Sequence, residues 1–128
     1  MKKVFLCVAT AMTAASSAHA QYMLAEGNFE SETTELRTIL LDKHKGIVAA
    51  SAVVAQGSCS GTIAGIGTIK DRMLVIKPYV KVEGGEQCVL RAKFDTKWER
   101  VQLSEGEGCS AYHGAACAWE GQTAKRKK

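Results

Sequence analysis

Long apolar runs, phosphate-binding loops and paired catalytic carboxylates are missing from this sequence of 128 residues. The apolar stretch of residues 4–15 is well short of the roughly 20 residues that a helix needs to cross a bilayer. The glycines of residues 61–67 are not followed by a helix start, as a nucleotide-binding loop requires. Glu105 and Glu107 share one flexible turn, which provides neither a glycosidase pair nor a calcium loop. We therefore expect no retained membrane anchor, no nucleotide-binding loop, no glycosidase activity and no calcium-binding loop.

Charge is balanced except at the two ends of the chain. The sequence has 17 Lys and Arg against 13 Asp and Glu, a formal net charge of +4. Lys2 and Lys3 open the chain and residues 125–128 are all basic, so the part between them has 11 cations and 13 acids. Nucleic-acid binding needs a clustered cationic stripe, and no nucleic-acid partner is expected. The basic tail is expected to be solvated, with electrostatic contact to an anionic envelope as the alternative.

Residues 1–20 have the features of a secretory signal peptide. Two lysines precede the apolar residues 4–15, and Ala18-His19-Ala20 is the small-x-small sequence that signal peptidase prefers. We expect cleavage before Gln21 and export to the periplasm or beyond. The remaining 108 residues fit one small domain.

Four cysteines remain after this cleavage. An even number of cysteines in a small exported chain predicts two disulfides, and three pairings are possible. We favour Cys109–Cys117, because these residues bracket a short glycine-containing loop, and therefore Cys59–Cys88 by elimination. Closing a loop of about 30 residues contributes roughly 3–4 kcal/mol in the chain-entropy description.

The fold is predicted to be mainly β. Glycine occurs 12 times and proline once, β-branched residues dominate the apolar segments, and turn residues separate several short apolar runs. This pattern is typical of an antiparallel sheet folded on itself. We therefore expect a small antiparallel β-barrel or sandwich, in meander order, stapled by two disulfides.

The clearest predicted strand covers residues 88–94, followed across a short turn by a second strand at 98–104. Arg91 and Lys93 alternate with apolar residues in the first of these strands. The side chains expected to face the core are Leu90, Phe94, Val101 and Leu103.

A second hairpin is predicted from residues 61–69 and 73–79, joined by a short polar turn. Gly65 and Gly67 lie on one face of its first strand, which suggests a sharp bend, a bulge or close backbone packing. Pro78 cannot donate to a sheet ladder, so we expect the second strand to end there.

Residues 31–56 leave two alternatives open. Leucine and isoleucine at helical spacing, with Ser31 as a cap and Gly46 as an end, favour a helix followed by a strand. Several threonines and the apolar run of residues 47–55 favour two strands instead.

The expected organisation is a signal peptide at 1–20, an N-terminal arm at 21–30, a β domain at 31–124 and a basic tail at 125–128. The last strand of the β domain is predicted at residues 115–123. Trp98 and Trp119 are expected to pack in the sheet rather than form a sugar platform.

The most distinctive segment is residues 108–117, in which two cysteines and a histidine have C-x3-H-x3-C spacing. This spacing could place three ligands on a metal, but zinc sites need a fourth ligand or water and usually contain closer cysteine pairs. Because the compartment is oxidising, disulfide formation is favoured and no metal is expected. A bridged loop would present Tyr112 and His113 to solvent.

Catalysis has two histidine candidates in the mature chain. His44 lies in a charged turn where exposure is the simpler interpretation. His113 could act as a general base for Ser110, but the sequence identifies neither a third member nor an oxyanion hole. We therefore expect a protein that is not an enzyme and uses no cofactor.

One pattern of cysteines and glycines runs through residues 57–123. It consists of Cys59-Ser60-Gly61, Cys88-Val89-Leu90, Phe94-Asp95, Gly108-Cys109, His113-Gly114, Cys117 and Gly121. This pattern resembles small exported domains of Gram-negative bacteria, which occur alone or after modules related to bacterial lysozyme inhibitors. The resemblance implies a periplasmic, disulfide-bonded, antiparallel β domain with a binding or inhibitory role. The Ser-Gly-x-x-Tyr segment of the membrane-bound c-type lysozyme inhibitors has no counterpart here, so no inhibitor residue is carried over.

These observations predict a periplasmic or secreted binding protein, such as an inhibitor or immunity protein acting on a lysozyme-like cell-wall hydrolase. The expected partner is a protein, and the expected contacts are Ser110, Tyr112 and His113, with tyrosine as the better energetic anchor. The alternatives are a structural or assembly subunit of an envelope complex and a small envelope enzyme that uses His113.

Overall fold

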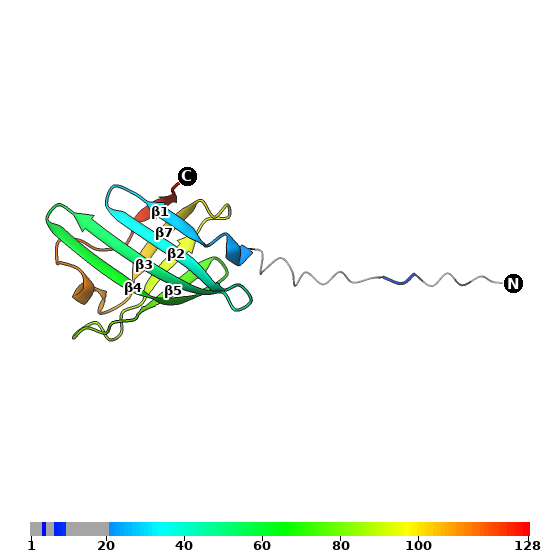
Figure 1. Ribbon diagram of the computed structural model, residues 1–128, viewed down its shortest axis with the longest axis horizontal. Helices are drawn as coiled ribbons and strands as arrows, with labels where there is room; N and C mark the ends of the chain where they lie inside the picture. Colours follow the sequence, from blue (N-terminus) through cyan, green and yellow to red (C-terminus); the bar gives the residue numbers. More distant parts are fainter. Residues whose placement is uncertain (1–3, 5–6, 10–20) are drawn as a thin grey trace.

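The computed structural model describes residue 4, residues 7–9 and residues 21–128 (Figure 1). Most of the expected signal peptide, residues 1–20, lies outside these residues, so cleavage before Gln21 stays a prediction. Within the described part of the chain, no helix has the length and apolar character of a membrane span.

The described chain folds into a closed antiparallel β-barrel. Each strand pairs with the next, and the last strand pairs with the first. The prediction of a mainly β fold is confirmed, and the barrel is the architecture that forms. The elements are β1 (Gly27–Glu30), β2 (Thr34–Asp42), β3 (Ile47–Gln56), β4 (Cys59–Lys70), β5 (Met73–Pro78), β6 (Leu90–Phe94), β7 (Arg100–Glu105), the 3-10 turn η1 (Cys109–Tyr112) and β8 (Thr123–Arg126).

Residues 31–56 form the two strands β2 and β3, which decides between the alternatives left by the sequence. Thr34, Leu36 and Thr38 are all buried at every second position of β2. The Thr34 hydroxyl donates to the Val53 carbonyl on β3 at 2.8 Å. The threonines that weaken a helix therefore satisfy their hydroxyls inside the barrel.

Both predicted hairpins are confirmed, and β5 ends at Pro78 as expected. Asp71 and Arg72 form the turn between β4 and β5 with φ angles of 51° and 64°. Two consecutive residues with positive φ make the kind of turn whose twist matches antiparallel strands.

Gly65 and Gly67 mark a place where β5 crosses very close to β4. A Cβ at Gly65 would lie 1.9 Å from the carbonyl oxygen of Lys77. A Cβ at Gly67 would lie 2.7 Å from Cδ1 of Leu74. Because only glycine leaves room for this approach, close backbone packing is the alternative that the structure shows at these two residues.

The interior of the barrel is filled by side chains. The four predicted core residues of the β6–β7 hairpin are at most 1% exposed. Trp98 is 4% exposed and Trp119 is fully buried, so both pack in the fold as expected. The rings of Phe29 and Phe94 meet edge to face with centroids 5.4 Å apart. Surface loops and the outer wall are therefore the places to look for function.

The two chain ends differ from the expected loose arm and solvated tail. Residues 27–30 of the arm form β1, and Lys125 and Arg126 of the tail belong to β8. The two strands pair with each other and close the barrel. The sequence missed both because each strand is only four residues long and carries little periodicity.

Arg126 is an anchor rather than a tail residue. Its Nε and Nη2 donate to the Trp98 carbonyl at 3.0 and 2.8 Å, and its Nη1 donates to the Glu26 carbonyl at 2.7 Å. A further bond runs from Nη2 to the Leu24 carbonyl. The guanidinium lies 4.6 Å from the centroid of the Phe29 ring. Arg126 thus ties the N-terminal segment and the β6–β7 turn to β8.

The prediction of a last strand at residues 115–123 is wrong. Residues 113–122 form a loop, and β8 begins only at Thr123. Cys117 is bridged to the start of β4, and the backbone N–H of Trp119 donates a hydrogen bond to the Glu105 side chain. Gly121 then turns the chain with a φ of 76°. These tertiary contacts override the apolar pattern of the segment.

Candidate functional site

Several long loops gather at one end of the barrel, which we call the disulfide end. It comprises the β5–β6 loop (residues 79–89), the segment between β7 and β8 (residues 106–122), which includes η1, and the β3–β4 turn. η1 and the tip of the β5–β6 loop lie at the left-hand end of the barrel in Figure 1. Two disulfides cross-link these loops and the start of β4.

The disulfide pairing differs from the favoured one. Cys59 is bonded to Cys117, and Cys88 is bonded to Cys109. The predicted Cys109–Cys117 and Cys59–Cys88 bridges are therefore wrong. The physical reason is the path of the segment after β7: η1 places Cys109 beside the end of the β5–β6 loop, with its Sγ 3.4 Å from the Val89 carbonyl. The following residues then cross the start of β4, where Cys117 meets Cys59.

His113 lies where this segment crosses β4. It forms an isolated antiparallel bridge with Gly61. A Cβ at Gly61 would lie 2.3 Å from the Cβ of His113, so the crossing requires glycine. The ring of His113 packs edge to face on Trp119, with centroids 5.3 Å apart. The His113 side chain is only 4% exposed, and the expectation that a bridged loop presents it to solvent is wrong.

Glu105, the last residue of β7, connects this crossing to the barrel. Its Oε1 lies 3.0 Å from Nε2 of His113, and its Oε2 accepts a hydrogen bond from the backbone N–H of Trp119 at 3.0 Å. The Glu105 N–H in turn donates to the Glu120 carboxylate at 2.7 Å. The Glu105 side chain is 15% exposed. The sequence placed it in a flexible acidic turn, and nothing local in the sequence distinguishes it from Glu107.

The hydrogen bonds around His113 fit the protonated ring. Nδ1 lies 2.6 Å from the Gly114 carbonyl, and Nε2 faces the Glu105 carboxylate. Both partners only accept hydrogen bonds at these atoms, so both ring nitrogens must donate. Burial lowers the pKa of His113, but the bond to Gly114 and the bond to and charge of Glu105 raise it overall above 6.5. When its ring is protonated, His113 therefore forms a buried ion pair with Glu105.

Tyr112 holds the β5–β6 loop against η1. Its hydroxyl donates to the Val80 carbonyl at 2.8 Å. Its ring packs on Gly85, where a Cβ would lie 2.6 Å from Cε2 of the tyrosine. The ring also contacts the hydrophobic core and is partly buried. Tyr112 thus supports the surface and offers only part of its ring to a partner.

Ser110 is exposed at the tip of η1, and of the three predicted contact residues it alone lies fully on the surface. The alternative of a general base for Ser110 does not fit the arrangement, because both ring nitrogens of His113 are held by Gly114 and Glu105. The alternative of a C-x3-H-x3-C metal site does not fit either. Cys109 and Cys117 are each oxidised to a different partner, so neither sulfur is a thiolate ligand.

Two exposed apolar residues begin the β5–β6 loop, and no sequence pattern singles them out. Tyr79 is 83% exposed and Val80 is 65% exposed. They directly follow β5, and the Val80 carbonyl is the acceptor of the Tyr112 hydroxyl. The disulfide end therefore presents an exposed tyrosine and valine on a loop that Tyr112 fastens to η1.

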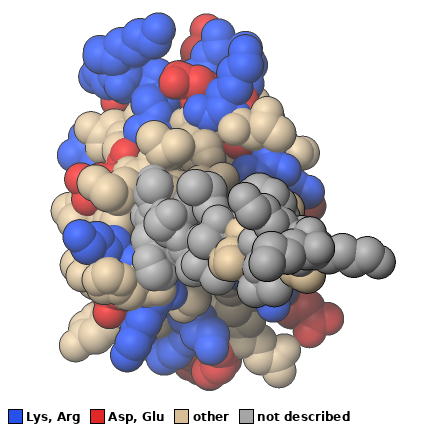
Figure 2. All heavy atoms as spheres, turned by 90° about the vertical axis from the view of Figure 1, so that its right-hand side faces the viewer, with Lys and Arg blue, Asp and Glu red and all other residues tan. Residues whose placement is uncertain are grey.

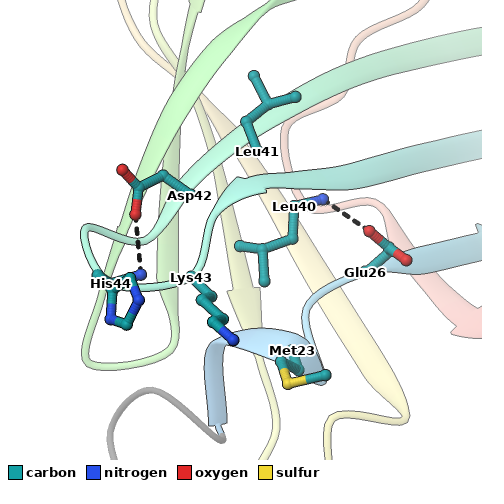
Figure 3. Close-up of a pocket in the computed structure, with 7 residues that line it drawn as sticks. All are labelled: Met23, Glu26, Leu40, Leu41, Asp42, Lys43 and His44. Carbon is teal, nitrogen blue, oxygen red and sulfur yellow. Dashed lines mark hydrogen bonds between the residues drawn. The ribbon is translucent and has the colours of Figure 1, made fainter.

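The opposite end of the barrel carries a shallow hollow beside the β2–β3 turn (Figure 3). Leu40 points toward Met23 of the N-terminal segment, and the Glu26 carboxylate accepts the Leu40 N–H at 2.9 Å. The Asp42 carboxylate accepts the N–H of His44, which is exposed as expected. Figure 2 looks onto this end and shows Lys and Arg around its rim with Asp and Glu among them. Both carboxylates of this hollow accept hydrogen bonds from backbone N–H groups, so a structural role in the segment around the turn accounts for them.

Comparisons of the chain with protein-family models, with curated proteins and with solved structures gave no match. Function is therefore argued from the barrel and its surface. The class defined by the structure is a closed eight-stranded antiparallel barrel with two disulfides. Two disulfides fit an exported protein.

Proposed function

We propose that this chain is an exported, non-enzymatic binding protein whose disulfide end binds a protein partner. The observation that carries the proposal is the exposed pair Tyr79 and Val80 on a cross-linked support. Tyrosine is enriched among the residues that dominate binding energy at protein interfaces. A large exposed apolar side chain on a fixed loop is a plain candidate for such an anchor.

Pre-organisation supports the proposal. The Cys88–Cys109 bridge, the Tyr112 hydroxyl and the His113–Glu105 pair all hold the loops around this surface. A loop that is already ordered loses little conformational entropy when it binds, which leaves more of the contact energy for affinity.

The contact surface proposed from the sequence changes in one respect. Ser110 remains a contact, Tyr112 contributes an edge of its ring, and His113 acts beneath the surface by holding the loop. Tyr79 takes the anchoring role that was predicted for Tyr112. The resemblance to domains associated with lysozyme-inhibitor modules supports a lysozyme-like cell-wall hydrolase in the periplasm as the partner.

The proposal is tested with purified exported protein and lysozyme-like hydrolases, by measuring both direct binding and inhibition. Tyr79→Ala is expected to weaken binding by about 2 kcal/mol, the size of an interface hot spot. Leu41→Ala is the matched control, because Leu41 is 57% exposed at the opposite end of the barrel. Equal binding by the two variants would reject the surface, and the absence of hydrolase binding by the wild-type protein would reject the partner.

A further inference from the structure

A hollow in the outer wall over β6, β7 and β8 is lined by basic and neutral polar residues, by the apolar Phe94 and Val101, and by one acid. Its volume is about 470 Å³. Arg72 reaches it from the β4–β5 turn, Lys93 from β6 and Arg100 from β7. Gln102 and Thr123 complete a row with Lys93, since the three residues are register partners on neighbouring strands. We call this group of five residues the cationic hollow.

Within the described part of the chain, no cation of the hollow lies within ion-pair distance of a carboxylate, although the charge of Arg100 acts on Asp95. The ion pairs there are Arg37–Glu35, Lys127–Glu30 and His113–Glu105, none of which includes a residue of the hollow. The charges of Arg72 and Lys93 are therefore available to a ligand, and the charge of Arg100 is shared with Asp95.

Asp95 is the one acid that lines the hollow, and it is engaged in the β6–β7 turn. Its Oδ1 accepts the N–H groups of Glu99 and Arg100 at 2.8 and 3.2 Å. Desolvation raises the pKa of Asp95, but these backbone hydrogen bonds and the charge of Arg100 lower it overall. With one ionised acid and three cations, the lining carries a formal charge of +2.

The backbone fixes Arg72 at the edge of the hollow. The Phe94 N–H donates to the Arg72 carbonyl at 2.9 Å, and Nη1 of Arg72 donates back to the Phe94 carbonyl at 3.3 Å. One guanidinium N–H is used in this way, and the fork of remaining donors suits bidentate binding of an oxyanion.

The outer wall around the hollow also places basic side chains close together, where repulsion between them lowers the stability of the fold. Arg100 lies directly opposite Lys125 on β8, and Arg91 lies two residues before Lys93 on the same exposed face of β6. Like charges opposite each other on neighbouring strands are destabilising. Glu30, the β1 neighbour of Lys125, is paired with Lys127. Destabilising pairs of like charges are expected where a surface has a function.

We propose that the cationic hollow binds a phosphate monoester group. Two guanidinium groups, an ammonium, an amide and a hydroxyl supply donors of the kinds that bind phosphate. The lining charge of +2 matches a phosphate dianion better than a monovalent carboxylate. The source of the group is either a small phosphate-bearing molecule or a phosphorylated lipid surface, and the site is separate from the disulfide end.

In the first test, the exported full chain is titrated with inorganic phosphate at constant ionic strength. Binding is measured by calorimetry and by changes in backbone amide chemical shifts. Lys93→Gln combined with Arg100→Gln is expected to weaken binding by about tenfold or more, because charge-assisted hydrogen bonds are the strong ones. Lys43→Gln combined with Lys45→Gln removes the same charge from the exposed β2–β3 turn and is expected to leave affinity unchanged. Circular dichroism confirms the fold of both double variants.

The second test separates the sources of phosphate. Vesicles of phosphatidylcholine with phosphatidic acid are compared with vesicles of phosphatidylcholine alone. Sedimentation only with the acidic vesicles, lost in the Lys93/Arg100 double variant, assigns a lipid surface, and binding of free phosphate without vesicle binding assigns a small ligand. The proposal is overturned if neither probe binds, if acetate binds as tightly as phosphate, if a DNA oligonucleotide binds more tightly than both probes, or if the control variant loses as much affinity as the test variant.

Discussion

The two ends of the barrel are held together by different chemistry. At the disulfide end, two covalent bridges and the His113–Glu105 pair order long loops. At the opposite end, the strands are joined by short turns, which need fewer stabilising contacts. Arg126 supplies these contacts by donating hydrogen bonds to three backbone carbonyls. Disulfides respond to redox conditions and histidine responds to pH, whereas arginine stays charged throughout. A change of redox conditions or pH can therefore loosen the disulfide end of this barrel and not the opposite end.

Removing a bridge is expected to have the largest effect. The Cys59–Cys117 bridge spans 58 residues and the Cys88–Cys109 bridge spans 21. In the chain-entropy description, replacing both cysteines of the first bridge by serine costs about 4 kcal/mol of unfolding free energy, and the same change in the second costs about 3 kcal/mol. Chemical denaturation of both double variants at one pH measures the difference. A larger cost for the shorter loop would show that strain or packing, rather than loop length, sets the contribution.

Glu105→Ala is expected to cost about 3 kcal/mol, because it leaves His113 as a buried charge without its partner. Glu107→Ala is the matched control: it removes the same charge two residues later from an exposed position and should stay within about 0.5 kcal/mol of the wild type. Urea denaturation at pH 6 gives both values. Similar costs for the two variants would mean that Glu105 does not tie the segment after β7 to the barrel.

Arg126→Ala is expected to cost about 2 kcal/mol, because it removes hydrogen bonds from a charged donor to one partly buried carbonyl and two exposed carbonyls. Lys125→Ala on the same strand is the control and should have little effect. The loss at Arg126 should be equal at pH 6 and pH 8, while the loss from Glu105→Ala should shrink at the higher pH. A pH-dependent loss at Arg126 would contradict the division of roles between the two ends.

Tyr112→Phe is expected to have the smallest effect, about 1 kcal/mol, because it removes only the hydroxyl that donates to Val80. Tyr79→Phe removes an exposed hydroxyl and serves as the control. Hydrogen exchange of residues 80–85 gives a second readout, with faster exchange expected in Tyr112→Phe alone. Unchanged exchange there would show that the disulfide, not the tyrosine, fixes the loop.

The strands that could be predicted from the sequence are those with a local signal. Arg91 and Lys93 alternate with buried neighbours over five residues, and Pro78 ends its strand for reasons visible in the sequence. The closing strands β1 and β8 have four residues each, which is too short for a pattern to emerge. Their strand structure depends on pairing with each other across nearly the whole chain.

The candidate site could be predicted only in part, because its parts meet through tertiary structure. The four cysteines and the segment around His113 are distinctive in the sequence, but the disulfide pairing depends on where η1 and β4 lie. Nothing in the sequence around Gly61 predicts that the chain at His113 crosses β4 at this glycine. Arg126 lay in a run of basic residues that reads as a tail, and its role depends on carbonyls about 28 and 100 residues away.

At the disulfide end, His113 is expected to be a buried imidazolium held by Glu105. Its folded pKa is raised above 6.5, so the stability it contributes is complete below about pH 6.5 and is lost as the pH rises through the folded pKa. Nitrogen NMR of the imidazole ring, followed across a pH titration, tests this directly. We predict two protonated ring nitrogens at pH 6.5 and a titration midpoint above that value. A neutral ring with one protonated nitrogen, or a midpoint at or below 6.5, would contradict the account.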